Sequence, residues 1–189
     1  MNEEDHLAMG RRFWRLQFSC AEVEDQCEVA LTALDLLRQD EAPFIEKRLA
    51  LHALLIAIAD LSKLLFENPN GWRCTKEERA RWVHGRQVLR AILSVRSDSP
   101  LRMREMRNFF EHYDEHLDRL MDRAQAGMAV LDLAIGPPED MADGAYRLRY
   151  FDTSTETLYF GEEPYDLAPV IEEIRSLRGR AHSVTHSSG

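Results

Sequence analysis

The stretch FWRLQFSCAEVEDQCEVALTALDLL, residues 13–37, decides the fold class because its apolar side chains recur at alternating steps of three and four. The residues on this seam are Phe13, Leu16, Cys20, Val23, Cys27, Ala30, Leu34 and Leu37. This spacing places them along one face of a helix, as in helices that pack along their whole length. The pattern predicts a long helix over residues 3–39 whose seam is covered by other helices.

Three more helices are expected before residue 126. Pro43 suits the first turn of a helix that continues to about Phe66. Thr75 and Glu78 have the spacing of a capping box, which predicts the start of a third helix. A fourth helix is expected from about Pro100, because apolar residues recur on one of its faces. They are Met106, Phe110, Tyr113, Leu117, Leu120 and Ala124.

A short section rich in β-forming residues follows the helices. The runs YRLRYFD (146–152) and ETLYFG (156–161) predict a hairpin, and Asp166 to about Arg180 predicts a final helix. An isolated hairpin is only marginally stable in water. This section is therefore expected to pack on the helical bundle or on a second chain.

The predicted fold is all-α: a four-helix bundle with a small appendage made of the hairpin and the C-terminal helix. The expected parts are a bundle over residues 1–126, a linker over 127–145, the appendage over 146–180 and a disordered tail over 181–189.

Composition points to an ordinary globular protein of one main domain, since 44% of its 189 residues are hydrophobic and 30% are charged. The three cysteines contain no CxxC pair, which argues against a disulfide framework or a zinc ribbon. The first residues are acidic, unlike a secretory signal. The most apolar segment, 49–65, carries charges and is shorter than the roughly 20 residues that span a bilayer. We therefore expect a cytoplasmic protein that makes no use of a membrane.

The net charge of −9 argues against nucleic-acid binding, but the charge is unevenly distributed. Residues 73–107 carry 10 basic and 4 acidic groups, a balance of +6, whereas the segments on either side are acidic. This basic segment leads directly into a polar helical stretch. Arginine-rich helix faces are also commonly just solvated, so both interpretations stay open.

The stretch MREMRNFFEHYDEHLDRL, residues 103–120, is the most site-like part of the chain. A helical wheel places five polar residues opposite the apolar stripe. They are Arg104, Asn108, His112, Glu115 and Arg119. Arg107 lies to one side, five positions before His112. The simple alternative is an exposed face with pairs such as Arg107 with Glu111, worth tenths of a kcal/mol each.

The segment from Arg107 to His112, RNFFEH, resembles the R-x(4-6)-H motif of HEPN domains, in which a polar residue such as Asn108 often follows the arginine. The resemblance covers about residues 5–125, because HEPN domains are helical bundles with the motif on a late helix. It implies a homodimeric, metal-independent ribonuclease of the kind found in toxin–antitoxin, phage-defence and RNA-processing systems. An antitoxin or regulatory protein is then a further implied partner.

The resemblance assigns roles to three residues. Arg107 would bind and orient the scissile phosphate, His112 would exchange protons, and Asn108 would hold the phosphate or the histidine. Arg104 and Arg119, on the same polar face, are the expected additional contacts to RNA.

One feature departs from the toxin branch of the family, which carries a tyrosine two positions after the histidine. Here Asp114 has that place and Tyr113 lies next to His112. Regulation by nucleotidylation of that tyrosine is therefore not expected.

The implied reaction is chemically sufficient without a metal or other cofactor. Cleavage of RNA through its own 2'-hydroxyl needs a base, an acid and positive charge on the transition state. A histidine with a pKa of about 6.5 serves as acid or base at neutral pH, and a two-fold dimer supplies two of them.

Two other functions stay open. The run HYDEH, residues 112–116, matches the H-x-x-E-H pattern of inverted zinc peptidases, with Glu172 or Glu173 as nominal third ligands. The other is a non-catalytic HEPN-like module that dimerises or binds RNA or nucleotides.

Overall fold

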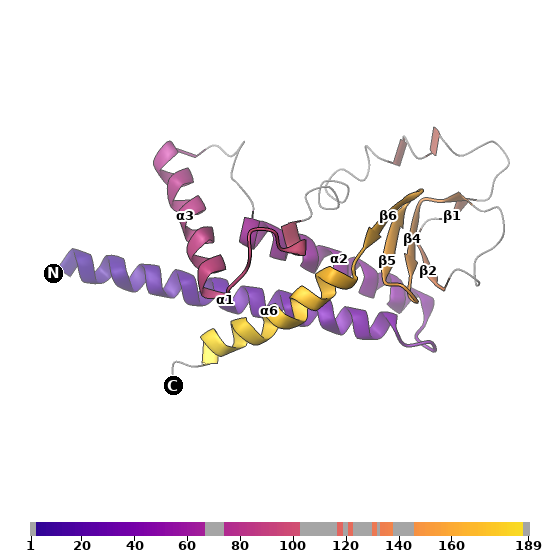
Figure 1. Cartoon of the computed structure of the whole chain (residues 1–189), viewed down its shortest axis with the longest axis horizontal. Helices are drawn as coiled ribbons and strands as arrows, with labels where there is room; N and C mark the ends of the chain where they lie inside the picture. Colours follow the sequence, from indigo (N-terminus) through magenta and orange to yellow (C-terminus); the bar gives the residue numbers. More distant parts are fainter. Residues whose placement is uncertain are drawn as a thin grey trace.

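The computed structural model describes residues 3–66, 74–102, 117–118, 121–122, 130–131, 133–137 and 146–186. The helices are α1 (Glu3–Leu37), α2 (Phe44–Phe66), α3 (Lys76–Ile92), the short 3-10 helix η1 (Pro100–Arg102) and α6 (Ala168–His186). The strands are β1 (Val130–Leu131), β2 (Ala134–Gly136), β3 (Tyr146–Arg147), β4 (Arg149–Asp152), β5 (Thr157–Phe160) and β6 (Glu163–Asp166). Figure 1 shows that α1 runs the length of the molecule, with α2 and α6 beside it.

Helix α1 confirms the prediction of a long first helix with an apolar seam. From Cys20 to Leu37, every seam residue is at most 1% exposed. Helices α2 and α6 cover this seam. The N-terminal part of the seam differs, since Phe13 is 51% exposed and Leu16 is half-buried.

Helix α2 lies in the core but keeps one apolar face in solvent. Its inward residues include Leu51, Leu54 and Leu55, whereas Ile45, Leu49 and Ile56 are 59–64% exposed. By length and composition α2 is the one helix of the described residues that could cross a membrane, but 56% of its apolar stretch is buried inside the protein. It therefore serves as a core helix with an uncovered side.

Helix α3 starts where the capping box predicts. The backbone N–H of Glu78 donates to Thr75 Oγ1 (3.1 Å), and the N–H of Thr75 donates to the Glu78 carboxylate (2.8 Å). Arg86 and Arg90 then donate to backbone carbonyl oxygens at the end of α2, those of Lys63 (3.0 Å) and Leu65 (2.5 Å). Cations stabilise the negative C-terminal end of a helix, so these arginines stabilise the contact between α3 and α2.

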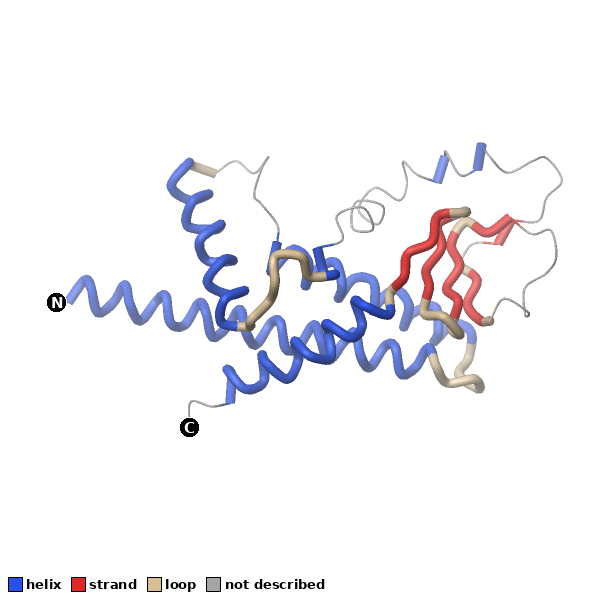
Figure 2. Tube along the Cα trace, in the orientation of Figure 1, coloured by secondary structure: helices blue, strands red, loops and turns tan. Residues whose placement is uncertain are grey.

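The predicted hairpin is present and belongs to a larger sheet. Strands β4 and β5 are antiparallel, with Tyr150 opposite Tyr159 and Phe151 opposite Leu158. Strand β6 extends the sheet beside β5, and β2 pairs parallel with β4, which makes the order β2-β4-β5-β6. Strands β1 and β3 form a separate parallel pair. The four-stranded sheet stands beside the end of α1 that leads into α2 (Figure 2).

The all-α prediction is wrong, because the chain combines long helices with this mixed sheet. Strands β1 and β2 lie in the predicted linker, 127–145, and β6 was not expected because EPYD contains poor strand formers. Pro164 is tolerated there because β6 is an edge strand. The predicted fourth helix falls largely outside the described residues, although 117–118 and 121–122 are helical.

The sheet packs on the helices, as expected for a hairpin that cannot stand alone. Leu148, Phe151, Leu158 and Phe160 belong to the same buried cluster as the α1 seam. Helix α6 continues to His186, whereas a disordered tail was predicted from residue 181. The reason is that Ala181 is fully buried, which extends the apolar stripe of α6 beyond the predicted end.

The turn between β4 and β5 is organised by the buried carboxylate of Asp152. It accepts hydrogen bonds from the backbone N–H (2.8 Å) and hydroxyl (2.6 Å) of Ser154 and from the N–H of Thr155 (3.3 Å). Burial alone raises the pKa of Asp152, but these hydrogen bonds outweigh burial and hold the pKa below its ordinary value. Glu156, in the same turn, pairs with Arg38 at the end of α1.

We predict that Asp152→Ala lowers the free energy of unfolding by about 1–2 kcal/mol, because it removes a buried carboxylate that accepts three hydrogen bonds from the turn. Asp98→Ala is the control: Asp98 pairs with Arg96 on the surface, so its loss should change the free energy of unfolding much less than the loss of Asp152. Urea unfolding measures both.

The pH dependence follows from the lowered pKa of Asp152. A carboxyl with a depressed folded-state pKa stabilises the fold above its unfolded pKa of about 3.9, and this stabilisation is lost as the pH falls through the folded pKa. The stability difference between the parent and Asp152→Asn should therefore shrink in acid. A difference that is constant from pH 7 to pH 2 would contradict this assignment.

Candidate functional site

The residues predicted for RNA cleavage lie outside the described residues. They are Arg104, Arg107, Asn108, His112 and Arg119. The alternative zinc pattern at 112–116 lies there as well. Its nominal third ligands are paired with arginines on α6: Glu172 with Arg175 (3.2 Å) and Glu173 with Arg180 (2.8 Å).

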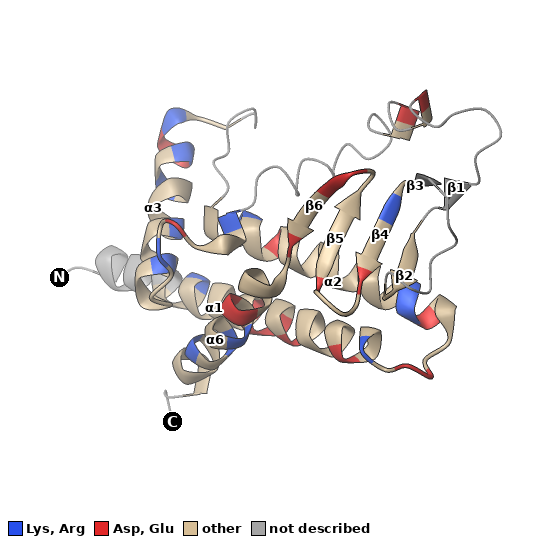
Figure 3. Cartoon of the chain, turned by 45° about the vertical axis from the view of Figure 1, so that its right-hand side comes forward, with Lys and Arg blue, Asp and Glu red and all other residues tan. Residues whose placement is uncertain are grey.

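The basic segment is less available to a phosphate than its charge suggests. Arg86 and Arg90 hold the end of α2, Arg96 forms a two-pronged pair with Asp98, and Arg102 donates to a backbone oxygen. The acidic residues of α3, Glu77 and Glu78, lie in its first turn, and the basic residues continue along the helix (Figure 3). Four arginines of this segment are thus already engaged in hydrogen bonds within the protein.

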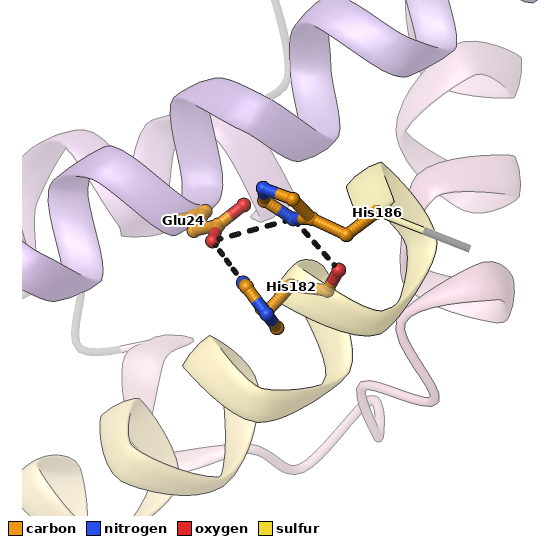
Figure 4. Close-up of side chains that lie close together, drawn as sticks. All are labelled: Glu24, His182 and His186. Atoms are coloured by element: carbon orange, nitrogen blue, oxygen red, sulfur yellow. Dashed lines mark hydrogen bonds and ion pairs between the residues drawn. The ribbon is translucent and has the colours of Figure 1, made fainter. Parts of the chain in front are cut away.

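The described residues bring together a different group of chemistry-bearing side chains, Glu24 of α1 with His182 and His186 of α6 (Figure 4). Each residue offers one possible metal-ligand atom, and these atoms all lie within 4.8 Å of one another. Nδ1 of His182 is 2.7 Å from Glu24 Oε1, and Nδ1 of His186 is 3.9 Å from the same oxygen. The two imidazole rings stack with centroids 4.1 Å apart.

The helix geometry explains why these three side chains meet. Residues four apart lie one above the other on a helix face, so His182 and His186 project from the same side of α6. Ala181 packs that part of α6 against α1, and one turn away Arg178 pairs with Glu28 of α1 at 2.5 Å. The contact between the two helices therefore holds Glu24 opposite the histidines.

Thr185 orients the carboxylate of Glu24. Its hydroxyl donates to Oε2 at 2.7 Å, which leaves Oε1 turned toward the two histidines. This hydrogen bond lowers the pKa of Glu24 more than burial raises it, and His182 and His186 lower the pKa further. The Glu24 side chain is only 15% exposed, while the histidine side chains are 61–62% exposed. The group is thus an ionised carboxylate at the bottom of an accessible surface site.

The donor set of two imidazoles and one carboxylate has two possible uses. It can form a hydrogen-bonded network that holds α6 on α1, or it can hold a divalent metal ion, since imidazole and carboxylate are common zinc ligands. The sequence alone does not predict this group, because the segment AHSVTHSSG, 181–189, has the composition of a disordered tail. The signal was nevertheless visible as two histidines four positions apart.

The cysteines do not offer a nucleophile in the core. Burial raises the pKa of Cys20, and it raises the pKa of Cys27 to about 12. Both thiols lie on the buried seam of α1 and act as small apolar side chains. Cys74, before α3, is half-buried.

No family model, curated protein or solved structure matches this chain. The resemblance to HEPN domains therefore stays a prediction from residues 107–112.

We predict that an alkylating reagent at pH 8 modifies Cys74 alone in the folded protein. At this pH, about 1 in 10⁴ of thiols with the pKa of Cys27 are ionised, and burial blocks access as well. Mass spectrometry should find one adduct in buffer and three in denaturant. Modification of Cys27 at the rate of Cys74 in buffer would mean that the seam of α1 opens readily.

Proposed function

We propose that the chain is a metal-independent endoribonuclease of the HEPN type that cleaves single-stranded RNA in the cytoplasm. The observation that carries the proposal is the motif RNFFEH at residues 107–112, which follows three helices in the order expected for a HEPN bundle. Helices α1, α2 and α3 precede this motif along the chain.

The proposed reaction assigns one task to each residue. The 2'-hydroxyl attacks the adjacent phosphorus, the bond to the 5'-oxygen breaks, and a 2',3'-cyclic phosphate remains. His112 removes the 2'-hydroxyl proton or protonates the leaving oxygen, and Arg107 stabilises the charge on the transition state. Asn108 holds the phosphate or the histidine. Arg104 and Arg119 contact the RNA backbone on either side.

Two arginines of α3 bind the end of α2 and are therefore left out of the proposed RNA contacts. Arg86 and Arg90 are engaged with α2, so they are not needed for binding RNA. The proposal therefore assigns the RNA contacts to arginines of the stretch 103–120 itself.

We predict that the purified protein cuts single-stranded RNA in the presence of a chelator and leaves DNA intact. His112→Ala should lower the rate by about 10²–10⁴-fold, and Arg107→Ala should remove roughly 3–4 kcal/mol of transition-state stabilisation. His84→Ala, on the exposed side of α3, is the matched control and should keep full activity. A substrate with hydrogen in place of the 2'-hydroxyl at the cut site should be inert.

Two results would contradict the assignment. If RNA binds but is not cut across varied sequences, the chain is the non-catalytic binding module instead. If His112→Ala and Arg107→Ala unfold at a lower temperature than the parent, their side chains are structural.

We further propose that the chain forms a two-fold dimer through the N-terminal part of α1. Phe13, Trp14 and Phe18 form an aromatic patch that is 51–71% exposed, and their rings contact one another. Phe13 continues the seam that is buried farther along α1, whereas Trp14 and Phe18 lie one turn apart on the opposite side of the helix. Exposed aromatic groups of this kind are typical of protein interfaces.

We predict that light scattering gives a mass near twice 21.9 kDa for the parent and near 21.9 kDa for Trp14→Glu/Phe18→Glu. Leu49→Glu is the control, since Leu49 of α2 is equally apolar and 64% exposed but lies outside the patch. A dimer that Leu49→Glu disrupts and the double variant keeps would place the interface on α2. A parent mass of 21.9 kDa at all concentrations would exclude the dimer.

A further inference from the structure

We propose that Glu24, His182 and His186 bind a zinc ion that joins the last turns of α6 to α1. The proposal is independent of RNA cleavage, because it concerns residues of α1 and α6 and assigns the metal no part in the reaction. It rests on the chemistry of the three donors, on their separations and on the residue that orients the carboxylate.

The donors match the chemical preference of zinc. Two imidazole nitrogens and one carboxylate oxygen form a His2Glu set, and histidines four apart on a helix present their rings to one ion. With neutral histidines the site carries the single negative charge of Glu24, which attracts a cation. The arginines of α6 are paired with other carboxylates, Arg175 with Glu172, Arg178 with Glu28 and Arg180 with Glu173.

The separations suit a small ion. Ligand atoms placed tetrahedrally at 2.0–2.2 Å from zinc lie about 3.4 Å apart. The distances from Glu24 Oε1 to the histidine nitrogens, 2.7 and 3.9 Å, fall on either side of this value. Zinc binding would require the hydrogen bond between His182 and Glu24 to open, and Nδ1 of His186 to leave the Thr185 hydroxyl (2.8 Å) and the His182 carbonyl oxygen (3.2 Å). The proton of each ring would then move to the other nitrogen.

Thr185 is a positioning residue in this site. Its hydroxyl donates to Glu24 Oε2, so the other carboxylate oxygen is presented to the ion. Hydrogen bonds of this kind fix the orientation of metal-binding carboxylates. Both histidines are more than half exposed, so zinc reaches the site from solvent and water can fill a fourth position.

The consequence for the molecule is a bridge between its two ends. Glu24 lies in the first helix, and the histidines lie in the last turns of the described chain. An ion that binds only the folded form stabilises it in proportion to the logarithm of its concentration over Kd. The bridge would therefore restrain the C-terminal end of α6, where the residues facing α1 become more exposed beyond Ala181.

The test is a calorimetric titration of the chelator-treated full-length protein with zinc, together with thermal unfolding at each zinc concentration. One zinc ion per chain is expected, and at 100 times Kd the Tm should rise by about 5–10 °C. His182→Ala and His186→Ala should each weaken binding roughly 100-fold or more, because even loss of an orienting residue costs about 10–100-fold. Thr185→Val should weaken binding about tenfold.

The controls separate this site from the alternatives. His84→Ala should bind zinc like the parent, and so should His116→Ala, which removes a ligand of the H-x-x-E-H pattern. Glu24→Gln keeps an oxygen that can accept from Thr185, so its Tm in chelator should stay near that of the parent while its response to zinc is lost.

Three outcomes overturn the proposal. The first is no zinc binding by the parent, which would leave the three residues as a hydrogen-bonded contact between helices. The second is binding that His182→Ala and His186→Ala leave unchanged. The third is binding that is lost in His116→Ala, which would place the ion at residues 112–116.

Discussion

The buried face of α1 between Cys20 and Leu37 is the surface on which the other two long helices pack. It combines small residues, such as Cys20, Cys27 and Ala30, with leucines toward its end. Small side chains let helix axes approach closely, and leucines fill the wider spaces between them. Helix α2 follows α1 directly, whereas α6 is the last element of the described chain. Both pack on this face, which therefore brings the first and last helices together. The sheet is held beside it by the shared core and by Arg38 with Glu156.

The features that could be predicted from the sequence are those decided within a few residues. The seam of α1 and the capping box of α3 depend on spacings of three and four, and the β4–β5 hairpin depends on two adjacent runs and their turn. Local patterns of this kind depend mainly on neighbouring residues, so they can be recognised without knowledge of the tertiary structure. The same holds for the assignment of Cys20 and Cys27 as apolar residues, which their burial confirms.

The missed features depend on partners far away in the sequence. Strand β2 has three residues and forms only because β4 offers a parallel edge, and β6 contains Pro164 yet pairs with β5. The end of α6 contains a serine, a threonine and two histidines, which makes it resemble a tail when considered alone. It is helical because α1 buries Ala181 and presents Glu24 to the histidines. The candidate metal site could not be predicted because one of its three residues lies about 160 positions before the others.

Two exposed apolar surfaces among the described residues differ in what they require of a partner. Phe13, Trp14 and Phe18 are large, have few rotatable bonds and already contact one another, so little conformational entropy remains to be lost on binding. The outer face of α2 presents separate aliphatic side chains, Ile45, Leu49 and Ile56, with His52 between the second and the third. Desolvation of a polar side chain such as His52 reduces the free energy gained by burying its apolar neighbours. The aromatic patch is therefore the better anchor for the proposed second copy, whereas α2 is held in the core by its buried inner face.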